Sequence, residues 1–91
     1  MKAATHQKKL RSALRAEIRH LTRCMQHLSR VDEETFARGK DVFATDAALA
    51  QWLCEPARSL QGAIPLATMR TAKGRRAVAE ALIRIAHGIP T

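Results

Sequence analysis

Three side chains near the N-terminus have the types and the spacing that a metal site uses. His20, Cys24 and His27 are four and three residues apart, so a helix would carry all three on one face. Imidazole and thiolate groups are ligands that zinc prefers. A single helix supplies only three ligands, however, and the sequence lacks the paired Cys-x-x-Cys knuckles that complete such sites. We therefore predict no metal or other cofactor, and interpret Cys24 as a residue near an apolar helix face, flanked by two surface histidines.

The segment TAKGRR, residues 71–76, could bind a phosphate group at the start of a helix. Backbone N–H groups at a helix N-terminus favour anions, and Thr71, Lys73 and Gly74 lie at such a start. The segment matches neither G-x-x-x-x-G-K-[ST] nor G-x-G-x-x-G, and no strand is expected before it. We therefore interpret it as the ordinary beginning of a helix.

Side chains that could catalyse a reaction are not grouped in the sequence. The chain has no tyrosine, and Ser12, Ser29 and Ser59 have neither a neighbouring base nor a glycine turn of the oxyanion type. Acidic residues gather where helices are expected to begin, and capping accounts for them there. These acids are Asp32, Glu33, Glu34 and Asp46. We predict that the protein is not an enzyme.

The positive charge is concentrated at the N-terminus. Residues 1–30 contain eight lysines and arginines against one acid, Glu17, which gives a net charge of +7. Residues 31–91 contain eight against seven, which gives +1. Contact with a polyanion is therefore expected in residues 1–30. Four arginines recur there at every fourth position: Arg11, Arg15, Arg19 and Arg23.

Two interpretations of these four arginines stay open. They could contact nucleic-acid phosphates, with an affinity that falls steeply as salt is added. They could equally form the solvated face of a helix that dimerises. A helix-turn-helix requires a second helix after a short turn, and residues 1–30 hold the pattern of one helix only. Sequence-specific DNA binding is therefore not expected from this segment.

The apolar pattern predicts an all-α protein. Hydrophobic residues make up 46% of the chain, which excludes wholesale disorder. Between His6 and about Ser29 they recur at spacings of three and four residues, which predicts one long basic N-terminal helix. The residues of this apolar stripe are Leu10, Leu14, Ile18, Leu21, Met25 and Leu28. Its last part resembles a coiled-coil seam, so we expect homodimerisation through this helix.

Residues 31–91 carry the start and stop signals of a compact bundle of three to four short helices. The caps expected at helix starts are Asp32, Thr45 or Asp46, and Thr71. Pro65 suits the first position of a short helix that buries Leu66 and Met69. The ending HGIP predicts that Gly88 terminates the last helix in a left-handed conformation. Two units are thus expected, residues 1–30 and residues 31–91.

The cysteines and the N-terminus bear on the compartment. Cys24 and Cys54 show no disulfide-framework spacing, which favours reduced thiols. The first residues include no apolar signal segment, and no apolar run is long enough to span a bilayer. We expect a cytoplasmic protein without membrane contact.

Residues 48–89 resemble the toxin-binding domain of the Xre/MbcA/ParS antitoxins. The shared pattern is a small-residue helix ending in Trp-Leu, a proline, a Leu-x-Gly turn, a Pro-Leu helix start, a helix opening at a glycine, and a closing RI-x-HG. The matching residues are Trp52, Leu53, Pro56, Leu60, Gly62, Pro65, Leu66, Gly74, Val78, Arg84, Ile85, His87 and Gly88. Residues 31–47 resemble the segment that usually precedes this domain, with Ala44 in place of a glycine.

The resemblance implies a type II antitoxin that neutralises a cognate RES-domain toxin, a class that consumes NAD or transfers ADP-ribose from it. Antitoxins of the family cover the toxin's NAD-binding cleft with the end of their last helix and the residues beyond it. At the corresponding positions stand Arg84, Ile85, His87, Gly88, Ile89, Pro90 and Thr91. The direction of that helix would be supported by Trp52, Leu53, Pro56, Gly62, Pro65 and Gly74. A rigid surface with a short protruding tail is expected.

The resemblance does not extend to the N-terminal segment. Family members generally carry an Xre-like helix-turn-helix before the toxin-binding domain, whereas residues 1–30 are predicted to form one helix. The alternative function is therefore a small basic nucleic-acid-binding protein that acts through this helix.

Overall fold

The computed structural model describes residues 2–91, and the side chains from residue 4 onward; Met1, within the predicted first unit, lies outside the described residues. The elements follow in the order α1 (Lys2–Gln26), η1 (Leu28–Arg30), α2 (Glu33–Val42), α3 (Asp46–Leu53), η2 (Arg58–Leu60), α4 (Pro65–Thr68) and α5 (Ala72–Ala86), where η denotes a 3-10 helix. No strand occurs in residues 2–91. The predicted all-α fold, a long first helix followed by shorter ones, is confirmed.

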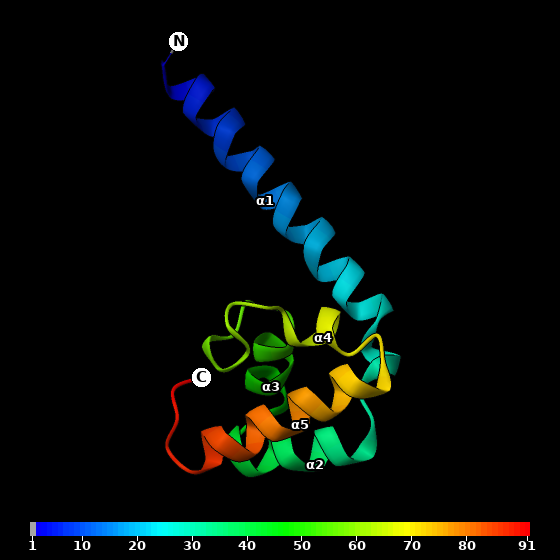
Figure 1. Ribbon diagram of the computed structural model, residues 1–91. Coiled ribbons are helices and arrows are strands. Elements are labelled where there is room, and N and C mark those ends of the chain that lie inside the picture. The colour runs from blue at the N-terminus through cyan, green and yellow to red at the C-terminus, as the bar shows by residue number, and fades with distance from the viewer. Residues whose placement is uncertain (1) are drawn as a thin grey trace.

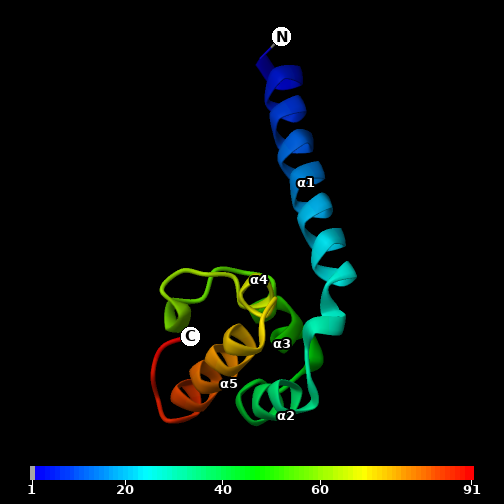
Figure 2. The same cartoon turned by 45° about the vertical axis from the view of Figure 1, so that its right-hand side comes forward.

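The molecule is elongated because α1 projects from the bundle that the other helices form (Figure 1). Its principal extents are 51 × 26 × 24 Å. Inside the bundle, α5 lies between α4 and α2 and packs on both (Figure 2). None of the helices in residues 2–91 combines the length and the apolar character needed to cross a membrane.

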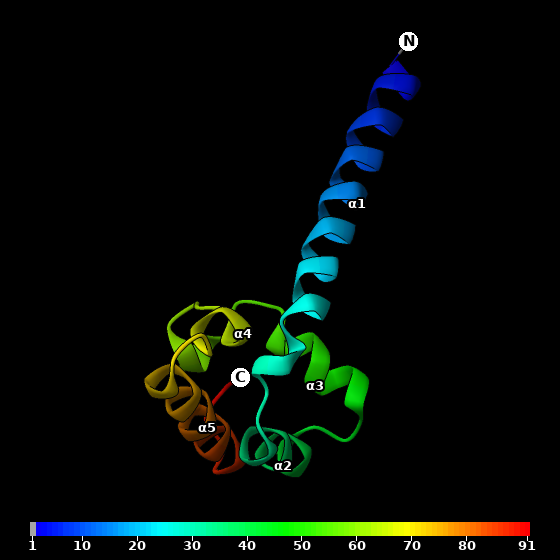
Figure 3. The ribbon, with the colours of Figure 1, turned by 90° about the vertical axis from the view of Figure 1, so that its right-hand side faces the viewer.

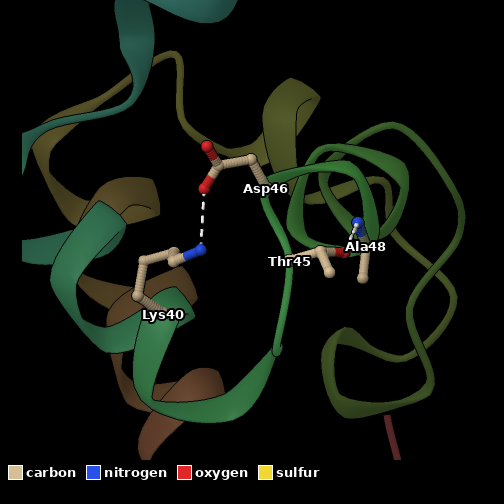
Figure 4. A network of polar contacts seen from close by, with 4 residues as sticks. All are labelled: Lys40, Thr45, Asp46 and Ala48. Carbon is tan, nitrogen blue, oxygen red and sulfur yellow. Dashed lines mark hydrogen bonds and ion pairs between the residues drawn. The ribbon is translucent and has the colours of Figure 1, made fainter.

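Short polar side chains cap three of the helices, as the sequence predicts. Asp32 accepts a hydrogen bond from the backbone N–H of Thr35 at 2.8 Å, and Thr71 accepts one from Gly74 at 3.0 Å. Of the two candidates for the α3 cap, Thr45 performs it, because its hydroxyl accepts from Ala48 N–H at 3.1 Å. Asp46 instead forms a 2.7 Å ion pair with Lys40 of α2 (Figure 4). Each cap stabilises its helix by about 1 kcal/mol.

The core lies between α3, α4 and α5. Its largest members are Leu49, Trp52 and Leu53 from α3, Leu66 and Met69 around α4, and Val78 and Leu82 from α5. The predicted burial of Leu66 and Met69 is confirmed. The ring of Phe43 packs on that of Trp52, with centroids 5.8 Å apart. This core holds α5 in one orientation relative to α3.

Prolines and glycines shape the path of the chain between α3 and α5. Pro65 occupies the start of α4, as predicted. Gly62 lies in the turn after η2 with a φ of +86°. At Gly74, an added Cβ would overlap the carbonyl oxygen of Thr68, so only glycine lets α5 begin this close to α4.

The C-terminal end of α1 is fixed to the bundle, whereas the rest of the helix is not. Cys24 is buried in the core, and Nε2 of His20 donates a 2.6 Å hydrogen bond to the carbonyl oxygen of Cys54. After α1, the Arg30 guanidinium donates to the Leu66 carbonyl oxygen at 3.1 Å. These contacts hold the base of α1 while its N-terminal part extends into solvent (Figure 3).

Candidate functional site

The C-terminal end of α5 is closed by a hydrogen-bonded cap. Gly88 has a φ of +98°, and its N–H donates to the carbonyl oxygen of Ile85 at 3.0 Å. The N–H of Ile89 donates to the carbonyl oxygen of Arg84 at 3.1 Å. These two bonds form a Schellman motif, which satisfies helix carbonyls that would otherwise lack a partner. The predicted left-handed glycine cap is confirmed, and it turns the following residues back toward the bundle.

The residues after this cap return to α3 and η2. The carbonyl oxygen of Thr91 accepts hydrogen bonds from the backbone N–H of Arg58 at 3.0 Å and from the indole Nε1 of Trp52 at 3.4 Å. The Arg84 guanidinium donates to the carbonyl oxygen of Ser59 at 3.0 Å. Figure 1 shows the C-terminus beside the loop that joins α3 to α4. The expected protruding tail is therefore wrong, since the segment is held at both ends and forms a closed loop.

The side chains of this loop are available to a partner. All residues from Ala86 to Thr91 are exposed, as is Arg84, while Ile85 is half-buried. Ile89 keeps 49% of its surface exposed. Residues 84–91 carry no acidic side chain, and the neighbouring η2 adds Arg58. The loop is thus a small apolar and basic surface, here called the α5-end surface: residues 84–91 with Arg58.

Sequence reasoning missed η2 as a part of this surface. Arg58 contacts the α5 end through its backbone N–H, and Ser59 through its carbonyl oxygen. Every residue has a backbone oxygen and nearly every residue a backbone N–H, so the residue types do not reveal these contacts. The only local indication is the turn signal that Gly62 gives just after η2.

The structure also places the residues that were expected to support the α5 end. Trp52 and Leu53 are buried in the core, and Pro65 is buried at the start of α4. Pro56, which is exposed, follows the end of α3. Together with the close approach at Gly74, these positions set how α5 leaves the core.

The four arginines of the predicted basic ridge lie on α1 and are all exposed. Among the side chains that the structure describes, the only ion pair joins Lys40 and Asp46, so none of the four is paired with a carboxylate. Residues 2–30 form α1 and η1, a helix followed by a single 3-10 turn. This segment therefore contains no helix-turn-helix.

The predicted apolar stripe of α1 is exposed to solvent. Leu10, Leu14, Ile18, Leu21 and Met25 lie on α1, whereas Leu28 lies in η1, and the six side chains keep between 41% and 66% of their surface exposed. So large a row of exposed apolar side chains is typical of an interaction surface.

His20 and Cys24 lie on the face of α1 that meets the bundle, and His27, directly after α1, lines the same hollow. Both histidines are half-buried and Cys24 is buried, so the prediction of surface histidines is wrong. Because a carbonyl oxygen only accepts, Nε2 of His20 carries the proton it donates to Cys54 and is not available to a metal. No group of three or more His, Cys, Asp or Glu side chains is placed to hold a metal ion in the described part of the chain.

The two cysteine thiols belong to the core of the bundle. Cys24 and Cys54 are both free and buried. Burial, and then the neighbouring Cys24 thiol, raise the pKa of Cys54 to about 12, so this thiol stays protonated and unreactive at neutral pH.

At the start of α5, the side chain of Thr71 accepts a hydrogen bond from the N–H of Gly74. This N–H is one of the amides that a bound phosphate would need.

The model of the antitoxin Xre/MbcA/ParS C-terminal toxin-binding domain matches residues 38–88, more than half of the chain. The chain belongs to this antitoxin family. In comparisons with curated proteins and with solved structures, nothing matches.

The matched segment begins within α2 and ends at Gly88, so it contains α3, α4 and α5. This segment is the toxin-binding domain of the antitoxin family, which implies a toxin as the partner. Helix α1 and the residues Ile89–Thr91 lie outside the match.

Proposed function

We propose that this antitoxin neutralises a RES-domain, NAD-consuming toxin by seating its α5-end surface over the toxin's active site. The observation that carries the proposal is the closed loop after α5, which is exposed yet fixed by the Schellman motif and by the two hydrogen bonds to Thr91. The antitoxin acts in the cytoplasm and needs no catalytic group, because blocking a cleft requires shape and charge only.

The fixed loop favours tight binding for an entropic reason. Ordering a flexible segment on association costs about 0.5–1.5 kcal/mol for each immobilised side chain. In this structure the backbone from Arg84 to Thr91 is already held at both ends. The exposed Arg84 and Ile89 are then presented in one arrangement, as a pre-organised inhibitor requires.

Co-expression tests this proposal. The antitoxin is produced together with the RES-domain toxin encoded beside it, and growth and co-purification are measured. Wild type is expected to restore growth and to co-purify with the toxin, and a chain ending at Gly88 to neutralise far less well. If wild type does neither, the toxin assignment fails; full rescue by the shortened chain excludes only a role for Ile89–Thr91.

We also propose that the antitoxin forms a homodimer through α1. The support is the exposed apolar stripe, whose six members keep between 41% and 66% of their surface exposed. Sedimentation of the wild type is expected to show a dimer, and Leu14→Glu with Ile18→Glu to give monomers of unchanged helicity. A wild type that sediments as a monomer at high concentration contradicts this part of the proposal.

Nucleic-acid contact through α1 is the second candidate. It is favoured by one observation, the exposed ridge of Arg11, Arg15, Arg19 and Arg23 without carboxylate partners. Titration of duplex DNA at two salt concentrations tests it, because each phosphate contact makes the affinity more sensitive to salt. Two results would exclude this nucleic-acid contact. One is an affinity for duplex DNA that is the same at both salt concentrations, and the other is a variant with all four arginines replaced by glutamine that binds DNA as wild type does.

A further inference from the structure

An apolar groove with an acidic rim lies where η1, α2 and α3 meet. Its volume is about 780 Å³, and its lining includes Leu28, Phe36 and Leu49. Phe36 keeps 48% of its surface exposed. The carboxylates on its lining are those of Asp32, Glu33 and Asp46, of which Asp46 is paired with Lys40, and none of the lysines and arginines whose side chains are described lines it. We call this feature the acid-rimmed groove.

The groove continues the apolar stripe of α1. Leu28 is the last residue of the stripe and also lines the groove, so the two features form one apolar surface. Figure 3 shows α3 beside the base of α1 and α2 below it. A helix that lay along the stripe toward Leu28 would therefore reach the groove.

We propose that α1 of a second copy covers both the stripe and the groove, and that the two α1 helices run antiparallel. This inference rests on the proposed homodimer and specifies its geometry. An antiparallel pair brings the basic N-terminal part of one α1, with Lys8 and Arg11, to the acidic rim of the other copy's groove. A parallel pair would instead place two strongly basic N-terminal parts side by side and would leave both grooves open.

The spacing of the stripe gives the register of the pair. If Leu21 lies opposite its own copy, Leu14 lies opposite Leu28 and Ile18 lies within one residue of Met25, so every stripe residue from 14 to 28 has an apolar partner. Leu10 then lies about 6 Å beyond Leu28, because each helical residue advances by about 1.5 Å. Because Leu28 lines the groove, Leu10 then extends toward it.

Charge reversal tests the groove contact. Glu33→Lys is expected to weaken dimerisation about tenfold, since the contact occurs twice in a symmetric dimer. In the double variant, Arg11→Glu should restore much of the dimer affinity that Glu33→Lys removes, because the two opposite charges are then present again with their positions exchanged. Glu34→Lys is the matched control: Glu34 lies in the same first turn of α2 but faces a different hollow, beside Arg75 and Arg76. If Glu33→Lys and Glu34→Lys weaken dimerisation equally, the groove contact is overturned.

Disulfide trapping tests the orientation. Leu14→Cys alone should not cross-link on oxidation, whereas a mixture of Leu14→Cys and Leu28→Cys should; Leu21→Cys should cross-link with itself. The native thiols do not interfere, because Cys24 and Cys54 are buried. Cross-linking of Leu14→Cys with itself overturns the antiparallel pair but leaves the dimer standing. A monomeric wild type overturns both, and neither result bears on toxin neutralisation.

Discussion

The indole Nε1 of Trp52 lies 3.4 Å from the carbonyl oxygen of Thr91 and donates a hydrogen bond to it. Trp52 is also a member of the core and keeps only 8% of its surface exposed. One side chain therefore joins the core to the loop that follows α5. The arrangement of the α5-end surface depends on that connection.

Replacing Trp52 by phenylalanine should loosen the loop without emptying the core. The loss of one hydrogen bond is expected to cost about 1 kcal/mol in the free energy of unfolding and to weaken toxin binding about fivefold. A chain that ends at Pro90 provides the control, because it lacks the Thr91 acceptor. Denaturant unfolding of both backgrounds measures the effect. An equal cost of the substitution in both backgrounds would show that Thr91 is not the partner that matters.

Replacing Gly74 by alanine should destabilise the fold, although alanine is the better helix former. The new Cβ would overlap the backbone carbonyl oxygen of Thr68, so α4 and α5 would have to move apart. We expect a loss of about 2 kcal/mol or more in thermal unfolding. Gly39→Ala is the comparison, because the atoms nearest to its Cβ belong to the side chain of Leu49 and not to the backbone. A Gly74→Ala protein as stable as wild type would contradict the close approach of the two helices.

Replacing His20 by alanine should release the base of α1. The hydrogen bond from its Nε2 to the Cys54 carbonyl oxygen is part-buried, and its loss is expected to cost about 1–2 kcal/mol in the free energy of unfolding. His27→Ala is the matched control, since His27 is also half-buried and lines the same hollow. Hydrogen exchange of the last turns of α1 should rise in the first variant and stay low in the second. The opposite order of effects would rule out the anchoring role of His20.

Asp32 should make the stability fall at acidic pH. The Thr35 side chain and then the Thr35 backbone N–H favour the carboxylate and hold the pKa of Asp32 below its usual 3.8. A lowered pKa means that the stabilisation is complete at neutral pH and is lost as the pH falls below that value. Asp32→Asn keeps the cap but does not titrate, so its free energy of unfolding should depend less on pH between about 2 and 5. Identical pH profiles of the two proteins would exclude a contribution from this carboxylate.

The parts of the fold that the sequence predicts are those with local causes. Thr71 and Asp32 cap helices through amides three residues away, and Gly88 ends α5 through bonds within the same turn. Threonine and aspartate are typical of helix caps, and glycine is typical of helix ends, so these residue types predict the roles. The stripe of α1 is predicted for the same reason, because its period is a property of one helix.

The parts that the sequence does not predict join distant segments through backbone atoms. Thr91 is 39 residues from Trp52, and Cys54 is 34 residues from His20. In both contacts the acceptor is a carbonyl oxygen, which every residue has, so no residue type marks it. For this reason the tail was expected to protrude and the histidines to lie on the surface. The acid-rimmed groove is missed likewise, since it exists only where three elements meet.

The central claim is that the α5-end surface binds the toxin, and the affinity of purified antitoxin for the purified toxin tests it most directly. Calorimetric titration compares Arg84→Glu with Lys73→Glu, two charge reversals of exposed residues at opposite ends of α5, after circular dichroism has shown that both remain helical. We expect Arg84→Glu to weaken binding about 30-fold or more, as a truncated interface hot spot does, and Lys73→Glu to bind like wild type. Wild-type affinity of Arg84→Glu, or an equal loss in both variants, would contradict the account.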